Sequence, residues 1–232
     1  MLIVHHLENS RSQRILWLLE ELQVPYQLQI HRRDSKTMLA PPALRAIHPL
    51  GKSPVIQDGE ITVAESGAII EYLVERYAPA WGSEPVGTMA GEPPAASGER
   101  RDYRYWLHYA EGTLMPLLVM TLIFAVIPRS PMPFFVKPIA RGLCSKVQET
   151  FLDPRLHENL EFLELALADR TWLVGERLTG ADVQMSFAVL ALLGRAVPGD
   201  GYPRLRAYLS RIEARPAWQR GLERGGPLNL LG

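Results

Sequence analysis

The stretch from Ser53 to Ser66 restricts the fold more than any other part of this chain. Val55 to Gln57 and Ile61 to Ala64 are two short strand-like runs, and Asp58-Gly59-Glu60 separates them. Asp-Gly is a strong signal for a tight turn, because both residues tolerate positive φ angles. The stretch therefore predicts a β-hairpin.

The hydrophobic period changes directly after this hairpin. Ile69, Tyr72, Leu73 and Tyr77 recur at the spacing of one helical face, and Ser66 stands where an N-cap is expected. We therefore expect a helix that begins at Ser66 and continues through Tyr77.

Polar groups at this junction suit an extended, peptide-like ligand. Pro54 removes one strand donor and forms an X-Pro bond of the kind that can be cis, which leaves the backbone of Ser53 available for pairing. The helix start at Ser66 offers free N–H groups to a carboxylate, and Glu65 can hold an ammonium group. A zwitterionic γ-glutamyl head satisfies both. An ordinary N-cap and an ordinary strand-end acid are the plainer alternatives, and their combination with Pro54 favours binding.

The preceding residues complete a regular order of elements. Leu2 to His6 reads as a strand, helical spacing follows through Glu21, and Tyr26 to Ile30 reads as a second strand. Such a βαβ unit has parallel strands and a right-handed crossover. Pro41 to Ala46 adds a short helix before the hairpin. The predicted order βαβαββα over residues 1–77 resembles a thioredoxin-like α/β domain.

Pro54, Asp58-Gly59, Glu65-Ser66 and Tyr72-Leu73 together form a pattern that resembles the glutathione-binding half of glutathione transferases. The run from Asn9 to Leu22 is similar to a bacterial and fungal subgroup of that family. The resemblance extends over nearly the whole chain. It implies a thioredoxin-like N-terminal domain, an all-α C-terminal helical bundle and a homodimer.

Residues 78–97 are rich in proline and glycine and have almost no apolar periodicity, so they predict an interdomain linker. The domains then span residues 1–77 and 98–232, and the second is almost entirely helical. Its most apolar stretch, Leu114 to Ile127, is shorter than the ~18 residues that suggest a membrane span, so a buried helix is expected. Pro116 should kink this helix, and Asp153-Pro154 should bend a later one.

A local signal marks another helix start in the second domain. Thr179 and Asp182 have the spacing of a capping box, and Leu178 with Val183 has that of a hydrophobic staple. We expect this cap to be structural.

Composition narrows the partners and the compartment. The 25 Lys and Arg residues balance 25 Asp and Glu residues, and no dense basic run occurs, so neither nucleic acid nor an anionic membrane is expected as a partner. Cys144 is the only cysteine, which excludes an internal disulfide and suits a reducing compartment. Met1 runs directly into strand-like residues, so no secretion signal is expected and the interpretation is cytoplasmic. His5 and His6 lie on the first predicted strand and are expected as core or edge residues, and no His/Cys spacing indicates a metal site.

By the resemblance, the chemistry depends on ionising the thiol of glutathione. The thiolate is the nucleophile, whereas a free thiol has a pKa near ~8.5. Lowering that pKa by about two units requires ~2.7 kcal/mol of preference for the anion. A hydroxyl hydrogen bond to a charged group supplies ~1.5–3 kcal/mol, and a helix N-terminus adds ~0.3–1 kcal/mol. One well-placed hydroxyl is therefore sufficient.

The turn after the first strand contains three candidate donors, Ser10, Asn9 and Ser12. In the serine-type members that this chain resembles, the catalytic hydroxyl follows the first strand, and Asn9 and Ser10 cover that position. No tyrosine occurs before Tyr26, and no cysteine occurs in the turn, so the tyrosine and cysteine types do not fit. Arg11 or Arg14 would add positive potential. Ser10 with Gln13 also matches a capping box, which is the plainer interpretation of that serine.

The resemblance assigns the remaining site residues. Ser53, Pro54, Glu65 and Ser66 would bind glutathione, and Lys52 would reach its glycine carboxylate or remain a solvated charge. Tyr105 and Tyr109 lie on the long helix that would face the glutathione domain, where they would line the electrophile pocket or pack in the core.

The resulting hypothesis is an enzyme that activates glutathione for attack on a hydrophobic electrophile, or on a hydroperoxide oxygen. Two alternatives stay open. One is a non-catalytic binding or assembly module with the same fold, and the other is a glutathione-dependent isomerase or dehalogenase. The pattern of Pro54, Glu65 and Ser66 favours a glutathione site over a pure assembly module.

Overall fold

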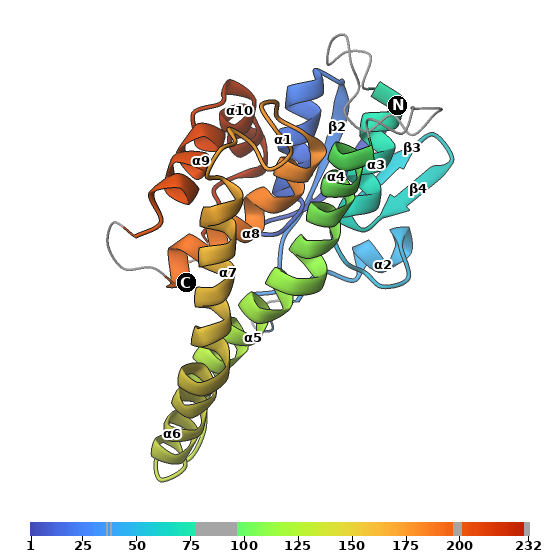
Figure 1. The fold of residues 1–232 in the computed structure, drawn as a ribbon. Helices are drawn as coiled ribbons and strands as arrows, with labels where there is room; N and C mark the ends of the chain where they lie inside the picture. The colour runs from blue at the N-terminus through green and yellow to red at the C-terminus, as the bar shows by residue number, and fades with distance from the viewer. Residues whose placement is uncertain (36, 38, 78–96, 197–200, 230–232) are drawn as a thin grey trace.

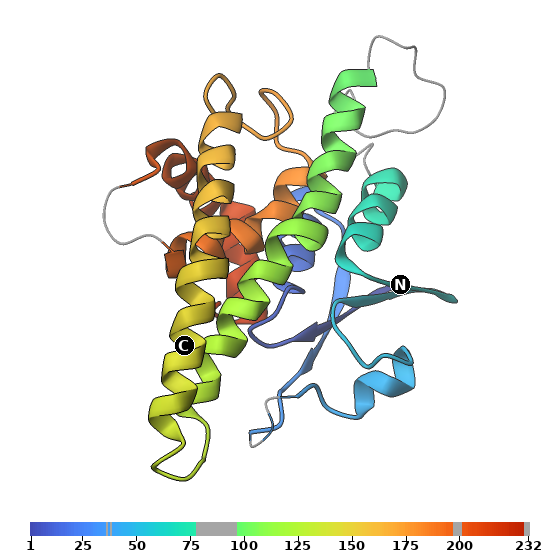
Figure 2. The same cartoon turned by 60° about the horizontal axis from the view of Figure 1, so that its bottom comes forward.

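The computed structural model describes residues 1–35, 37, 39–77, 97–196 and 201–229. A four-stranded sheet with its helices forms the N-terminal part, and helices form the rest (Figure 1). The helical part lies against the side of the sheet that carries α1 (Gln13–Leu22) and α3 (Ser66–Tyr77) (Figures 1 and 2). Residues 78–96 of the predicted linker lie outside the described residues, so both the linker and the domain bounds stay predictions.

The sheet has the strand order β2-β1-β3-β4. Strand β1 (Leu2–Leu7) pairs in parallel with β2 (Tyr26–His31) and antiparallel with β3 (Val55–Asp58), which continues through the turn into β4 (Ile61–Ala64). Both the predicted βαβ unit and the predicted hairpin are confirmed. Because β1 lies in the middle, the turn that follows it has the end of β2 on one side and the start of β3 on the other.

Helix α1 is the buried centre of the molecule. Its apolar residues from Ile15 to Leu19 are fully buried, since α1 is covered by the sheet, by α8 (Gly180–Ala196) and by α10 (Pro216–Gly225). Trp17 meets Trp218 of α10 edge to face at 5.2 Å between ring centroids, and Glu21 is paired with Arg215. The C-terminal helices are therefore packed directly onto the first domain.

Two interrupted helices make up much of the helical part. Helix α4 (Ser97–Tyr109) continues through a π-helical turn, Ala110–Leu114, into α5 (Met115–Val126). Helix α6 (Lys137–Val147) continues through a second π-helical turn, Gln148–Leu152, into α7 (Asp153–Ala166). Each turn comes directly before a proline-containing helix start, at Pro116 and Pro154, which is where the sequence predicts a kink and a bend. The short helix α2 (Ala43–Ile47) and helix α9 (Pro203–Glu213) complete the set of α-helices in the described residues.

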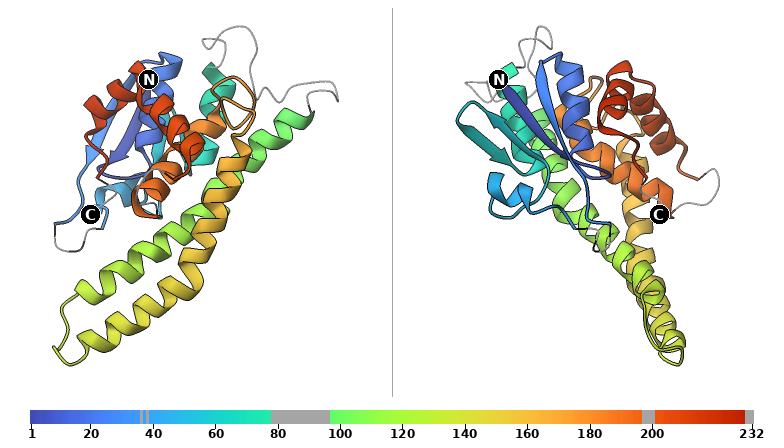
Figure 3. Two further views of the ribbon diagram at one scale, coloured as in Figure 1. Left: turned by 60° about the vertical axis from the view of Figure 1, so that its left-hand side comes forward. Right: turned by 180° about the vertical axis from the view of Figure 1, so that it is seen from behind.

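The outer halves of α5 and α6 form a hairpin that projects from the body (Figures 1 and 3). The helical stretch Gly98–Arg129 is long and apolar enough, by length and composition, to cross a membrane, with a mean hydropathy of 2.0 in its most apolar window and 28% of that window buried. The expected burial of residues 114–127 is correct for Leu114, Leu117 and Leu118. It is wrong for the outer residues, because the hairpin extends past the elements that cover the inner ones. Those exposed side chains are Val119, Leu122, Ile123, Val126 and Ile127.

The start of α8 confirms the predicted capping box. The Thr179 hydroxyl accepts a hydrogen bond from the N–H of Ala181 at 3.2 Å, and the Asp182 carboxylate accepts one from the N–H of Thr179 at 2.8 Å. The same carboxylate accepts bonds from the Thr179 and Tyr208 hydroxyls and from the N–H of Leu173. Burial raises the pKa of Asp182 to about 6, and these four bonds oppose that rise.

Candidate active site

The turn between β1 and α1 differs from the sequence prediction. Helix α1 begins at Gln13 with Ser12 as its N-cap, and Ser12 makes no side-chain cap bond. The Gln13 side-chain oxygen is buried and has no hydrogen-bond partner. The capping box of Ser10 and Gln13 is therefore wrong. The Ser12 hydroxyl is directed back to β1 instead of to the helix, where it lies 2.8 Å from Nδ1 of His6.

A buried hydrogen-bond chain runs from Ser10 into the first strand. The Ser10 and Ser12 hydroxyl oxygens are 2.8 Å apart, and Nε2 of His6 lies 2.9 Å from the carbonyl oxygen of Gly225. A carbonyl only accepts, so the Nε2–H of His6 donates to Gly225. Burial lowers the pKa of His6, and in the neutral ring Nδ1 then accepts from Ser12. That leaves Ser10 to donate its proton to Ser12 in the resting chain.

Asn9 lies in the same turn, but its side chain is occupied elsewhere. Its backbone is left-handed, with a φ of 50°. The side-chain amide donates to the carbonyl of Asn229 and its oxygen accepts from the N–H of Asn229, both at 3.0 Å. Asn9 thus holds the C-terminal segment against the end of β1, a contact across 220 positions of sequence.

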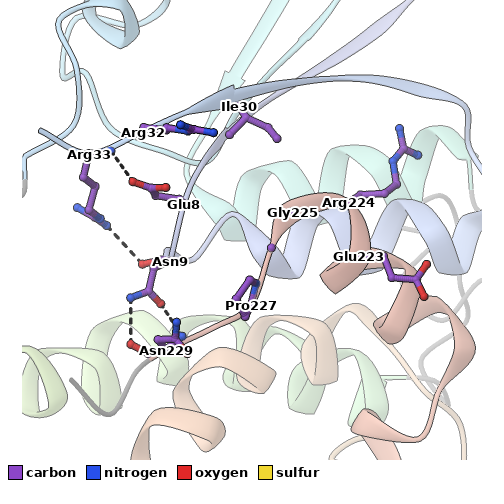
Figure 4. A pocket seen from close by; sticks show the side chains of 11 residues that line it. Glu8, Asn9, Ile30, Arg32, Arg33, Glu223, Arg224, Gly225, Pro227 and Asn229 are labelled. Carbon is purple, nitrogen blue, oxygen red and sulfur yellow. Dashed lines mark hydrogen bonds between the residues drawn. The ribbon is translucent and has the colours of Figure 1, made fainter. Parts of the chain in front are cut away.

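Asn9 also lines a pocket of about 540 Å³ between the end of β2 and the end of α10 (Figure 4). Arg33 closes one side of it, since its backbone N–H donates to the Glu8 carboxylate at 3.0 Å and its guanidinium lies 3.5 Å from the carbonyl of Asn9. Neither Pro54 nor Ser66 lines this pocket. It therefore lies on the β2 side of the turn, whereas the predicted glutathione residues lie on the β3 side.

The β3 side brings several predicted residues together. The Ser53–Pro54 peptide bond is cis. The Ser53 hydroxyl donates to the carbonyl of His5 at 2.9 Å and accepts from the N–H of Leu7 at 3.2 Å. The same N–H lies 3.2 Å from the hydroxyl of Ser12. One backbone group of β1 thus links the Ser10–Ser12 turn to the segment that precedes β3.

The start of α3 has its cap one residue earlier than expected. Helix α3 begins at Ser66, and the carbonyl of Glu65 accepts the N–H of Ile69 at 2.9 Å, so Glu65 stands in the N-cap position. Glu65 has a left-handed φ of 71° and is exposed, whereas Ser66 is buried. Left-handed backbone in residues other than glycine is uncommon and gathers at functional sites. Asn9 and Glu65 are two of the four such residues in the described chain. Lys52, which directly precedes Ser53 in sequence, is exposed.

Arg11 and Arg14 bind the helical domain. Arg11 pairs with one oxygen of Glu111 at 2.5 Å, and the fully buried Arg14 lies 2.9 Å from the other. Arg14 also donates to the carbonyl of Gln184 at 2.6 Å. Burial lowers the pKa of Arg14 to about 10, so it stays charged at neutral pH. Two cations around one carboxylate leave a net positive charge next to the turn.

Tyr105 and Tyr109 are not brought to the turn. Their rings stack at 5.7 Å, and both meet Phe162 of α7. The hydroxyl of the buried Tyr109 donates to Asn159 of α7, and burial raises its pKa. Two residues along the helix, Glu111 instead reaches Arg11. The tyrosine face of α4 therefore packs within the helical domain.

Sequence reasoning named Ser12 as a candidate donor but missed four other contributors to this site: His6, Glu111, Gly225 and Asn229. His6 was expected only as a core or edge residue, and it is buried. Its contact to Gly225 spans 219 positions, and Arg11 to Glu111 spans 100. Such contacts leave no local sequence signal. In the part of the chain that the structure describes, no group of His, Cys, Asp or Glu side chains is arranged to hold a metal ion.

Comparison with known proteins identifies the family. The profile of the glutathione S-transferase N-terminal domain matches residues 10–76, and that of the C-terminal domain matches residues 114–216. Glutathione S-transferase 3 of Schizosaccharomyces pombe is 34% identical over 94% of this chain and 85% of its own length. Glutathione S-transferase 1 of Saccharomyces cerevisiae is 31% identical over 97% of this chain and 95% of its own.

Solved structures of glutathione S-transferases have a similar fold. A glutathione S-transferase from Actinobacillus pleuropneumoniae has a TM-score of 0.74 at 32% identity and covers 99% of this chain and 95% of its own. A theta-class enzyme from Xanthomonas axonopodis pv. citri, solved with glutathione bound, has a TM-score of 0.67 at 26% identity and covers 98% of this chain and 99% of its own.

The fold is thus a thioredoxin-like α/β domain joined to an all-α domain, with a polar turn and a helix N-terminus at their junction. The chain belongs to the glutathione S-transferase family and is an enzyme of that family. The family uses glutathione as a substrate.

Proposed function

We propose that this enzyme binds glutathione between the Ser10–Ser12 turn and the start of α3, and activates its thiol for attack on a hydrophobic electrophile. The observation that carries this proposal is the buried hydrogen-bond chain from Ser10 through Ser12 to His6. It ends in a hydroxyl at the first turn after β1. That hydroxyl can reverse its proton to face a thiolate.

In this proposal, the residues next to β3 bind glutathione. Glutathione would lie extended against Ser53 and Pro54, just beyond the β1–β3 ladder, whose last pair is His5 with Val55. The γ-glutamyl carboxylate would meet the N-terminus of α3 at Ser66, and its ammonium group would meet Glu65. Lys52 would reach the glycine carboxylate.

Ser10 is a better thiolate donor than Asn9, because both side-chain groups of Asn9 are already paired with Asn229. The thiol proton would leave to solvent. Ser10 would then turn its O–H from Ser12 to the thiolate, while its oxygen keeps the N–H of Ser12 and the neutral ring of His6 keeps accepting from the Ser12 hydroxyl.

Positive charge near the turn would help to stabilise the glutathione thiolate. The pairing of Arg11 and Arg14 with a single Glu111 leaves one cationic charge in excess. Because Arg14 is buried, this charge is screened less by solvent than a surface charge. Arg11 would therefore act through the local potential, while its guanidinium stays bound to Glu111.

The electrophile would approach from the helical domain. Tyr105 and Tyr109 pack against Phe162 and Asn159 of α7, so they would support the wall of the helical domain and not contact the electrophile at the turn. Conjugation at carbon, reduction of an organic hydroperoxide, and glutathione-dependent isomerisation or dehalogenation all begin from the same thiolate. We propose conjugation, in a cytoplasmic homodimer with a role in detoxification.

Calorimetric titration of glutathione into the wild-type protein and three variants tests the site. Glu65→Gln should weaken binding at least about tenfold, because it removes a charged partner of the ammonium group. Ser10→Ala should leave binding nearly unchanged but raise the pKa of the bound thiol by about one to two units, measured by thiolate absorbance against pH. Asn9→Ala is the matched control and should leave that pKa in place.

Two results would overturn parts of the proposal. A raised thiol pKa in Asn9→Ala, with none in Ser10→Ala, would transfer the donor role to Asn9. Absence of binding up to millimolar glutathione would contradict the site and favour a binding or assembly module with this fold.

A further inference from the structure

The projecting hairpin, residues 119–147, carries an unusual concentration of exposed apolar side chains. We call this segment the arm. It comprises the outer part of α5, a turn, and α6 (Figure 3). Its exposed large apolar residues are Val119, Leu122, Ile123, Val126, Ile127, Phe134, Phe135, Ile139 and Leu143. Scattered apolar residues are normal on a protein surface, but a continuous set on one element indicates an interaction site.

The charged side chains of the arm are all basic. From Gly112 to Gln148 the sequence contains Arg129, Lys137, Arg141 and Lys146 and no Asp or Glu. Among the described residues, none of these four side chains forms an ion pair. The rest of the chain then holds 21 basic and 25 acidic residues. The balanced total, which argued against a membrane partner, conceals this separation of charge.

The end of the arm is a projecting tip rather than a groove. Phe134 is 84% exposed and Phe135 is 63% exposed, and their rings meet edge to face at 5.6 Å. The tip lies far from the sheet, at the end of the hairpin (Figures 1 and 3). A convex tip with two free aromatic rings suits insertion into a soft interface.

We propose that the arm docks this enzyme on an anionic membrane surface. Phe134 and Phe135 enter the boundary between headgroups and acyl chains, and the four basic residues meet anionic headgroups. This is the combination of apolar and cationic signals that peripheral membrane binding requires. The inner part of α5 stays buried in the protein at Leu117 and Leu118, so the arm lies on the membrane and does not cross it.

Charge argues against packing of two arms against each other. Two arms packed together would bring eight like charges into one apolar contact, whereas anionic headgroups neutralise them. Each basic residue near such a surface contributes about a fivefold change in affinity, and this contribution weakens with added salt.

Co-sedimentation of the full chain with lipid vesicles tests the proposal. Vesicles of phosphatidylcholine alone are compared with vesicles that also contain phosphatidylglycerol. We expect binding to the anionic vesicles that falls as salt is added. The double variant Phe134→Ser/Phe135→Ser should bind at least about tenfold more weakly, and Arg141→Glu about fivefold or more.

Leu165→Ser is the matched control, because Leu165 is 69% exposed on α7 outside the arm, and it should bind like the wild type. Circular dichroism checks that each variant is folded, and analytical ultracentrifugation reports its oligomeric state. Equal binding by the double variant, or no binding to anionic vesicles, would overturn the proposal. So would dissociation of an oligomer by the double variant without loss of vesicle binding, which would assign the arm to a contact between copies. None of these results depends on glutathione binding.

Discussion

The N-termini of α8 and α1 satisfy their buried hydrogen-bonding groups in opposite ways. At α8, the Thr179 hydroxyl accepts from the N–H of Ala181, and the Asp182 carboxylate accepts from the N–H of Thr179. The carboxylate also accepts from Leu173 and Tyr208. Every group in that cap is committed within the helical domain. At α1, the hydroxyl of Ser12 is directed back to His6, and Ser10 follows it.

The difference between the two helix starts shows which of them has a polar group available to a ligand. The α8 cap is closed, because four donors converge on one carboxylate and nothing is left to meet a ligand. The α1 turn is open at one end. Among the described residues the Ser10 hydroxyl bonds only Ser12, through its hydroxyl and its N–H, and it can redirect its own O–H to a ligand. A closed cap contributes stability, whereas an open chain of hydroxyls gives up some stability for a donor that can change its partner.

Removal of the carboxylate from the closed cap should have the largest effect. Asp182→Ala leaves the N–H groups of Leu173 and Thr179 and the hydroxyl of Tyr208 without their acceptor in a buried site. We expect a loss of about 3–5 kcal/mol in the free energy of unfolding. Urea denaturation followed by circular dichroism measures it.

The control is Asp153→Ala. Asp153 also lies in the first turn of a helix, α7, but it is exposed. Its removal should cost less than about 1 kcal/mol. Similar losses in the two variants would show that the α8 cap gains nothing from its convergent donors.

Removal of the middle hydroxyl from the open chain should have an intermediate effect. Ser12→Ala deprives His6 of its Nδ1 donor, but the N–H of Leu7 keeps the hydroxyl of Ser53 as an acceptor. We expect a loss of about 1–2 kcal/mol in stability, together with a raised pKa of bound glutathione. Ser145→Ala, an exposed serine on α6, should change neither. A Ser12→Ala protein that loses stability but keeps the thiol pKa would show that Ser12 and His6 do not support the thiolate donor.

Local patterns predicted the parts of this molecule that local contacts determine. The hairpin after Pro54 forms because Asp58-Gly59 supplies the turn and the flanking runs supply the strands. The box at Thr179 forms because both of its partners are within three residues. The cap of α3 moved by only one residue, from Ser66 to Glu65, within the usual uncertainty of a helix boundary.

The features that the sequence did not predict depend on contacts between residues far apart in the chain. Ser10 and Gln13 have the same spacing as the α8 box, yet the hydroxyl and the N–H of Ser12 hold the Ser10 hydroxyl, and the box does not form. The pairing of Asn9 with Asn229 depends on how α10 packs against α1. The apolar run from Leu114 to Ile127 would have the same sequence pattern in a buried helix and in an exposed one. Its exposure follows from the projection of the arm, which the sequence does not show.

Replacement of Gln13 should have the smallest effect of the three. In a formed capping box this residue would hold a backbone N–H, as Asp182 does, but here its buried oxygen has no partner and lies near Gly225. Gln13→Met keeps the volume and removes an unsatisfied polar atom, so stability should change by less than about 0.5 kcal/mol or rise slightly. Urea denaturation on the same scale as Asp182→Ala gives the comparison. A loss above about 2 kcal/mol would mean that Gln13 caps α1 in solution and that the two helix starts are alike.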